Sequence, residues 1–217
     1  MKRLVLVFAL SGTLLAAETV NFDSARVGAV PDGWTATMTH TGGSPKWEVM
    51  KDSTAPSQPN VLAQTTSDRT NGRYPLAIYN KVSGTNGKLS MEFKPISGEV
   101  DASGGLVWRY RDENNYYVVR ANALEDNVVL YKVEKGRRSS LAPKGTATKT
   151  YGVKHTIPAK IWSTLGVTFE GNLFTVYYNG EKLFQVEDST FTGAGKTGLW
   201  TKADSVTHFD NFQVDVK

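Results

Sequence analysis

The chain has 217 residues, a formal net charge of +4 and no cysteine. The absence of cysteine excludes disulfide bonds and thiolate metal sites. Its 25 basic residues form no dense cluster, so the composition does not favour a nucleic-acid partner, and we expect none.

The first 17 residues have the three parts of a secretory signal peptide. A basic start, Lys2-Arg3, precedes the apolar run 4–10, and Ala16-Ala17 provides a small-residue cleavage site. The run is too short for a membrane-spanning helix, and no other stretch approaches about 20 apolar residues, so no membrane span is expected. The alternative is a buried amino-terminal helix or strand.

Cleavage after Ala17 would leave residues 18–217, a length sufficient for one domain with a sizeable core. This mature chain would carry 23 basic and 21 acidic residues, a net charge of +2. The sequence therefore predicts a single-domain protein that is secreted or periplasmic, and we expect it to be a monomer.

Short extended segments separated by Gly, Pro and polar turns run through the first hundred residues. The pair Asn86-Gly87 predicts a two-residue hairpin, because this dipeptide tolerates the positive φ angles that such a turn needs. The run 88–94 alternates Leu89, Met91 and Phe93 with polar residues, as expected of a strand with one buried face. The predicted strands of this region are 19–23, a segment beginning at Trp34, 46–50, 61–65, 76–82 and 88–94.

Residues 104–134 predict a three-stranded antiparallel meander. Its strands are 106–111, 116–122 and 128–133, and the turns between them are rich in Asp and Asn. Because side chains alternate between the two faces of a strand, one face of this sheet should be apolar and the other should mix aromatic residues with Arg and Asn. In the middle strand, this mixed face carries Tyr116, Val118, Arg120 and Asn122.

A second meander is predicted from 161–170, 173–179 and 182–187, with turns at Gly171-Asn172 and Asn179-Gly180. Two more strands, 197–201 and 205–216, complete the chain. No segment shows a sustained helical period. The predicted fold class is therefore all-β, a two-sheet antiparallel β-sandwich.

Three stretches carry a family resemblance. They are GGLVWRYRDENNYYVVRANALEDNVVLYKVEKGRR from Gly104, the hairpin YYNGEKLF and the ending GKTGLWTKADSVTHFDNFQV. Together they resemble the secreted bacterial domains of the concanavalin A-like lectin/glucanase superfamily, with a laminin-G-like jelly roll, and are similar to its 3-keto-disaccharide hydrolase group. The resemblance implies two curved sheets with carbohydrate recognition on or beside the concave face. It implies less about activity, because this fold carries lectins, glycanases and non-catalytic modules.

The motif of a retaining glucanase is incomplete. Such an enzyme of this superfamily would show Glu-x-Asp-x-x-Glu along one strand, which places three carboxylates on one face. The nearest string contains Glu99 and Asp101 but lacks the last carboxylate, and we interpret it as a loop. The pair Glu125-Asp126 likewise resembles a turn.

Other catalytic motifs do not occur. The three histidines, His40, His155 and His208, are far apart, and neither His-Glu-x-x-His nor Gly-x-Ser-x-Gly is present. We interpret His208 as a packing or surface residue. No catalytic residue is therefore predicted from the sequence, although distant residues could still assemble a site in space.

A carbohydrate-binding face is predicted on the meander and near the end of the chain. Arg, Asn and Tyr offer the donors and acceptors that sugar hydroxyls need, and aromatic rings can pack on the C–H face of a pyranose. The alternative is that the aromatic rings fill a core that the arginine stems cover. We interpret Arg137-Arg138 as a solvated hairpin tip. The predicted ligand-binding residues are Arg109, Tyr116, Arg120, Asn122, Tyr131 and Trp200.

The resemblance also suggests a structural calcium ion, because relatives of this sandwich often join their terminal strands with one. Asp23 near the start and Asp210 near the end are the predicted oxygen ligands, helped by backbone carbonyls. The alternative is that each Asp caps a turn or accepts hydrogen bonds from the backbone. No cofactor is otherwise required.

Three functional hypotheses follow. The first is an exported, non-catalytic, lectin-like domain that binds oligo- or polysaccharides. The second is a glycoside hydrolase or 3-keto-glycoside hydrolase, which two carboxylates facing each other across a deep cleft would favour. The third is an envelope protein-interaction module, which a face filled by its own side chains would favour.

Overall fold

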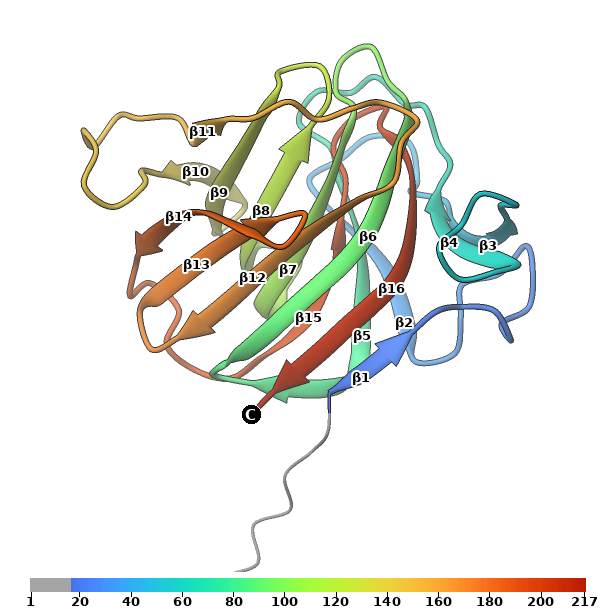
Figure 1. Ribbon diagram of the computed structural model, residues 1–217, viewed down its shortest axis with the longest axis horizontal. Coiled ribbons are helices and arrows are strands. Elements are labelled where there is room, and N and C mark those ends of the chain that lie inside the picture. Colours follow the sequence, from blue (N-terminus) through green and yellow to red (C-terminus); the bar gives the residue numbers. More distant parts are fainter. Residues whose placement is uncertain (1–16) are drawn as a thin grey trace, which may run out of the picture.

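The computed structural model describes residues 17–217, which form two antiparallel β-sheets packed face to face (Figure 1). The predicted signal peptide lies outside the described residues, except for Ala17. Between Ala17 and Lys217, no helix is long and apolar enough to cross a membrane.

Sheet A contains both ends of the described chain and has the strand order β14-β13-β12-β6-β16-β4-β3, with β1 paired to β16. Sheet B has the order β10-β9-β8-β7-β15-β5-β2, with β11 paired to β9. The strands of sheet A are β1 (Glu18–Val20), β3 (Trp47–Lys51), β4 (Asn60–Gln64), β6 (Gly87–Ser97), β12 (Ser163–Glu170), β13 (Leu173–Tyr178), β14 (Glu181–Glu187) and β16 (Val206–Val216). The strands of sheet B are β2 (Trp34–Thr39), β5 (Tyr74–Gly84), β7 (Ser103–Asp112), β8 (Asn115–Asn122), β9 (Asn127–Glu134), β10 (Arg137–Leu141), β11 (Val153–Lys154) and β15 (Gly195–Trp200).

The strand order confirms both predicted meanders. Strands β7, β8 and β9 are consecutive neighbours in sheet B, and β12, β13 and β14 are consecutive neighbours in sheet A. Between β13 and β14, Asn179 and Gly180 have φ angles of 48° and 83°, the positive pair that a tight hairpin turn needs. The predicted all-β, two-sheet fold is confirmed.

The predicted hairpin at Asn86-Gly87 is wrong. Strand β5 belongs to sheet B and β6 to sheet A, so this short connection crosses between the sheets. The carbonyl of Lys217 accepts hydrogen bonds from the backbone N–H groups of Thr85 (2.9 Å) and Asn86 (3.0 Å), which ties the crossing to the end of the chain. The dipeptide signals a turn, whereas the partner of each strand depends on which sheet buries its apolar side chains.

Strand β10 was not expected from the sequence, and it changes the interpretation of Arg138. In the pairing of β10 with β9, Arg138 lies opposite Val133, whose side chain is buried on the outer face of sheet B. Arg138 therefore lies over that face, and the prediction of a solvated hairpin tip is wrong for this residue.

The sandwich core lies between the inner faces of the two sheets. Trp108 of β7 is fully buried and stacks on Tyr117 of its own sheet, with ring centroids 5.5 Å apart, and on Phe169 of sheet A at 6.0 Å. The alternation predicted for β6 is confirmed, because Leu89, Met91 and Phe93 all point into this core. Contacts of this kind join the two sheets into one packed unit.

A second apolar cluster covers the outer face of sheet B. It contains Val107, Val118 and Val129 from the meander, together with large aromatic side chains of neighbouring strands. The buried residues of this cluster are at most 8% exposed, so this face is not an ordinary solvated sheet surface. The long side chains of the sheet itself cover this face, and most of the predicted binding residues are among them.

Candidate functional site

Five of the six predicted binding residues lie together on the outer face of sheet B. The strand register places Arg120 of β8 between Gly105 of β7 and Val129 of β9, and it pairs Trp200 of β15 with Gly105. Each of the five is at most 2% exposed, so none offers a free stacking surface. The five residues are Tyr116, Arg120, Asn122, Tyr131 and Trp200.

Arg109 lies elsewhere, which corrects its grouping with Arg120. A register shift after Trp108 and a φ of 48° at Arg109 break the alternation of β7. The guanidinium donates to the backbone carbonyls of Thr85 (3.0 Å from Nε), Phe191 (2.6 Å from Nη1) and Gly171. Arg109 is 1% exposed, and its donors are occupied by these three carbonyls. It therefore cross-links three chain segments.

A charged cluster surrounds Arg120 at one end of the outer face. Its Nη2 donates to Glu125 Oε2 (2.7 Å) and to Asn127 Oδ1 (2.9 Å), and its Nη1 lies 3.4 Å from Asp101 Oδ2. Lys202 Nζ lies 3.3 Å from the same Asp101 oxygen. Two cations and two carboxylates thus balance each other in a largely buried setting, as buried charges require.

Glu125 is the accessible member of this cluster, since its side chain is 39% exposed and that of Asp101 is fully buried. Burial acts to raise the pKa of Glu125, but the hydrogen bond and charge of Arg120 outweigh it and hold this pKa below its usual value. Glu125 is therefore ionised at neutral pH and faces solvent beside a buried guanidinium.

Arg138 lies over three aromatic rings of the same face. Its guanidinium carbon is 4.4 Å from the ring centroid of Tyr131, 4.9 Å from that of Tyr74 and 5.7 Å from that of Trp200. The Tyr131 hydroxyl hydrogen-bonds the hydroxyl of Tyr151, which is 47% exposed. Arg138 and Tyr151 thus form the outer layer above the buried aromatic residues, where cation–π contacts stabilise the guanidinium.

Three buried donors on this face have no hydrogen-bond partner among the described residues. They are Nε of Arg120, Nδ2 of Asn122 and Nη1 of Arg138. The other groups of Asn122 and Arg120 are engaged; Asn122 Oδ1, for example, accepts from the backbone N–H of Leu124 at 2.8 Å. Unpaired buried donors are uncommon in folded proteins, and these three lie below the accessible layer of the face.

The remaining carboxylates of the two short strings behave as loop residues. Glu99 is 74% exposed and pairs with Arg69 at 2.7 Å. Asp126 accepts a hydrogen bond from the backbone N–H of Ile157 (3.0 Å). Both contacts agree with the loop and turn interpretation.

The predicted calcium ligands Asp23 and Asp210 meet at Ser57. Its backbone N–H donates to Asp210 Oδ2 (2.8 Å), and its hydroxyl donates to Asp23 Oδ2. The other two carboxylate oxygens also accept backbone N–H groups, from Asn60 to Asp23 and from Asn211 to Asp210. Between residues 17 and 217, no group of three or more His, Cys, Asp or Glu side chains is placed to hold a metal ion.

The donor set around Asp23 and Asp210 therefore only partly fits calcium, which takes six to eight oxygen ligands. All four carboxylate oxygens already accept hydrogen bonds. The local charge, in contrast, favours a cation: burial, followed by the charges of Asp23 and Glu92, raises the pKa of Asp210 to about 6. The calcium site stays a prediction.

The sequence interpretation missed a polar cluster on sheet A. Asp52 Oδ2 accepts from Lys94 Nζ (2.5 Å) and lies 2.7 Å from His208 Nδ1. Burial lowers the pKa of His208, against the opposing effect of Asp52. Residues so far apart in sequence give no common motif, so only the fold could bring them together.

The sandwich, with its polar and aromatic outer face, defines an all-β jelly-roll domain. The model of the 3-keto-alpha-glucoside-1,2-lyase-like domain family matches residues 19–215, and the chain belongs to this family. No functionally curated protein matches the chain.

Solved structures with the same fold include carbohydrate-related proteins. Carbohydrate-binding module CBM66 from Bacillus subtilis has a TM-score of 0.59 and 21% identity, over 83% of this chain and 93% of that chain. The cellulose-induced protein Cip1 has a TM-score of 0.63 and 10% identity, over 92% and 97%. Domain 4 of AbnA, a GH43 extracellular arabinanase from Geobacillus stearothermophilus solved with arabinotriose, has a TM-score of 0.50 and 15% identity, over 82% and 81%. At these identities the likeness shows the fold.

Proposed function

We propose that the domain binds carbohydrate on the outer face of sheet B without transforming it. The observation that carries this proposal is the accessible layer of Arg138, Tyr151 and Glu125 above the buried aromatic rings and Arg120. Sugar hydroxyls can donate to the Glu125 carboxylate and accept from Arg138, and the exposed ring of Tyr151 offers a surface for a pyranose C–H face. The carbohydrate-related family and fold point in the same direction.

The residues that a ligand can reach differ from the binding residues expected from the sequence. Arg138, Tyr151 and Glu125 reach solvent and make the first contacts with a ligand. Arg120 and Asn122 are fully buried and hold these residues in place from below. A face filled by its own side chains would also suit a protein-interaction module. The accessible mixture of a carboxylate, a guanidinium and a phenol ring favours a ligand rich in hydroxyl groups instead.

Binding is tested on a glycan array with purified residues 18–217, in calcium and in chelator, followed by calorimetry on each hit. Arg138→Met should weaken binding about tenfold or more, since a charge-assisted hydrogen bond contributes about 1.5–3 kcal/mol and 1.4 kcal/mol is a factor of ten. Tyr151→Ala removes the stacking ring and should also weaken binding. Tyr177→Ala, on the half-buried outer face of sheet A, is the matched control. Unchanged affinity in folded Arg138→Met and Tyr151→Ala would refute the proposed face.

A lyase is the second candidate, favoured by the two carboxylates on Arg120. Asp101 Oδ2 and Glu125 Oε1 each lie 3.4 Å from Arg120 Nη1, so these oxygens are at most 6.8 Å apart. In a 3-keto-glucoside, the C2 proton is acidic because it is adjacent to the carbonyl. Ionised Glu125 would take this proton, the C1–oxygen bond would break as the C1=C2 bond forms, and the released alkoxide would be protonated by water. The charges of Arg120 and Lys202 would stabilise the enolate.

The lyase is tested by incubating the protein with a 3-keto-α-glucoside and measuring the released alcohol and the absorbance of the enone. Turnover that Glu125→Gln abolishes would establish catalysis and replace the non-catalytic proposal. Binding of the same sugar without product would leave the lectin-like function as the conclusion.

We further propose that the protein is exported after cleavage at Ala17, on the strength of the basic and apolar pattern of residues 1–17. Amino-terminal sequencing of the protein recovered outside the cytoplasm should begin at Glu18. An amino terminus at Met1 would contradict export by this route.

A further inference from the structure

The charged cluster at Arg120 is balanced within the protein. Arg120 pairs with Glu125 at 2.7 Å and with Asp101 at 3.4 Å, and Lys202 pairs with Asp101 at 3.3 Å. Two cations and two carboxylates thus neutralise one another at this end of the outer face of sheet B.

Arg138 adds a further positive charge to the same face, and it forms no ion pair with any residue between 17 and 217. Its side chain is half-buried and its Nη1 is buried, so the guanidinium has lost part of its contact with water. The rings of Tyr131, Tyr74 and Trp200 attract this cation but do not neutralise its charge. A charge partly removed from water is unfavourable without a counter-ion, so the group that Arg138 lacks is an anion.

The nearby carboxylates of the protein do not supply this anion. Glu134 lies opposite Arg137 in the pairing of β10 with β9, and the side chains of Arg137 and Arg138 point to opposite sides of their strand. Glu125 is held by Arg120. An anion for Arg138 must therefore come with the ligand.

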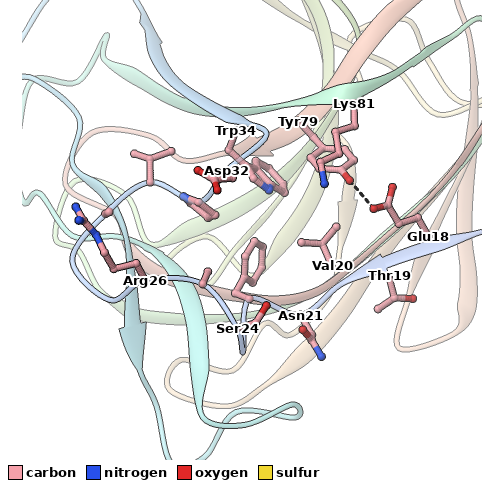
Figure 2. Close-up of a pocket in the computed structure, with 15 residues that line it drawn as sticks. Glu18, Thr19, Val20, Asn21, Ser24, Arg26, Asp32, Trp34, Tyr79 and Lys81 are labelled. Atoms are coloured by element: carbon pink, nitrogen blue, oxygen red, sulfur yellow. Dashed lines mark hydrogen bonds between the residues drawn. The ribbon is translucent and has the colours of Figure 1, made fainter.

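A cavity of about 730 Å³ beside β1 shows the contrast (Figure 2). Its rim carries Glu18 and Asp32 together with Arg26 and Lys81, two carboxylates and two cations that are all exposed to water. Glu18 also accepts a hydrogen bond from the hydroxyl of Tyr79 (2.7 Å). This rim has no partly buried cation in search of an anion, whereas the outer face of sheet B has one.

We propose that the carbohydrate bound on the outer face of sheet B is acidic, with the carboxylate of a uronate residue beside Arg138. This inference rests on the proposed function and names the class of its ligand. A planar guanidinium can donate two parallel hydrogen bonds to the two oxygens of a carboxylate, which a single hydroxyl cannot accept.

The position of Tyr151 suits the same sugar unit. The guanidinium carbon of Arg138 lies 4.4 Å from the ring centroid of Tyr131, and the ring centroid of Tyr151 lies 6.0 Å from that of Tyr131. Arg138 and the exposed Tyr151 therefore flank one buried ring, so the ligand carboxylate and the C–H face of its ring can be held side by side.

The test is calorimetry of residues 18–217 with trigalacturonate and with its methyl ester, which keeps the sugar rings and their hydroxyls but removes the charge. The natural chain should bind the acid at least tenfold more tightly than the ester, because a carboxylate accepts stronger hydrogen bonds from a guanidinium than a neutral group does. Arg138→Met should remove this preference. Arg137→Met removes the same charge from the exposed neighbour on β10 and should keep it.

The outcomes separate this inference from the proposed function. Equal affinity for acid and ester, or a preference that Arg137→Met removes as fully as Arg138→Met, would overturn the acidic ligand. If Tyr151→Ala weakened the binding of both probes in that case, the proposed face would stand. Binding of a neutral array glycan by protein that binds neither probe would also overturn the acidic ligand alone, and an absence of binding to any glycan would overturn both.

Discussion

Replacing Arg109 tests whether this residue is a structural cross-link. Arg109→Met keeps an unbranched stem but removes the donors to Thr85, Phe191 and Gly171. The hydrogen bond to the Phe191 carbonyl is buried, so its loss leaves a buried acceptor without a donor, at a cost of about 1–3 kcal/mol. The other two carbonyls can gain water, and each lost bond costs about 0.5–1.5 kcal/mol. We expect the free energy of unfolding to fall by about 3–4 kcal/mol.

Urea unfolding at pH 7, followed by tryptophan fluorescence, measures this loss. In a thermal scan the same loss corresponds to a decrease in Tm of about 10 °C, at about 2–4 °C per kcal/mol for a domain of this size. Arg111→Met is the matched control, because Arg111 is exposed and stacks on Phe191 at 5.1 Å, a contact of about 0.5–1 kcal/mol.

The structural role of Arg109 would be refuted by a loss below about 1 kcal/mol. It would also be refuted if Arg109→Met weakened glycan binding at unchanged stability. The second result would return Arg109 to the binding face, as the simple alternation of β7 predicts.

Three shorter predictions concern charge, metal and backbone. The raised pKa of Asp210 means that its ionised form opposes folding, an effect absent below about pH 4 and complete above about pH 6. Asp210→Asn removes this effect, so its free energy of unfolding should rise relative to that of the natural chain between about pH 4 and pH 6. The gain should reach about 3 kcal/mol, at 1.36 kcal/mol per pKa unit. A difference that does not change with pH would contradict this prediction. If Asp23 and Asp210 bind calcium, chelator should lower the Tm of the natural chain but not of Asp210→Asn, whereas equal melting of metal-free and calcium-loaded protein would remove the calcium prediction. Gly180→Ala should cost about 1 kcal/mol in urea unfolding because its φ is 83°, while Gly166→Ala, with no atom within 3.4 Å of the added Cβ, should be nearly neutral.

The sequence predicted the sheets well wherever one face of a strand is buried and the other is wet. Leu89, Met91 and Phe93 alternate with polar residues, and the structure places all three in the sandwich core. The turn at Asn179-Gly180 is also predicted correctly, because the two strands that it joins pair with each other. These signals are local, and a period of two fixes which side chains share a face.

The errors came from interactions that are distant in sequence. Asn86-Gly87 carries the same turn signal as Asn179-Gly180, yet its strands belong to different sheets. Arg109 has the spacing of an outer-face residue, but the register shift after Trp108 turns it away. The sequence predicts a surface charge at Arg138, because β10 contains too few apolar residues to reveal its pairing with β9.

The sequence pattern grouped residues that share the outer face of sheet B, but it did not identify the residues that pair with them or cover them. Period two correctly grouped Arg120 with Asn122, since both lie on one strand. It gave no indication that Asp101 and Lys202 would meet at Arg120, or that Arg138 and Tyr151 would cover Tyr131. Burial depends on what later segments lay over a strand, and no pattern within the strand records it.

The two arginines that lie against the ring of Tyr131 differ in what a ligand would gain from each. Arg120 is already paired with Asp101 and Glu125, so an incoming acceptor must compete with carboxylates for its guanidinium. Arg138 forms no ion pair among the described residues, and its half-buried side chain lies above the ring of Tyr131. An acceptor beside Arg138 therefore gains a charge-assisted hydrogen bond without displacing another. For this reason we expect Arg138, which the sequence gave no reason to select, to contribute more to affinity than Arg120.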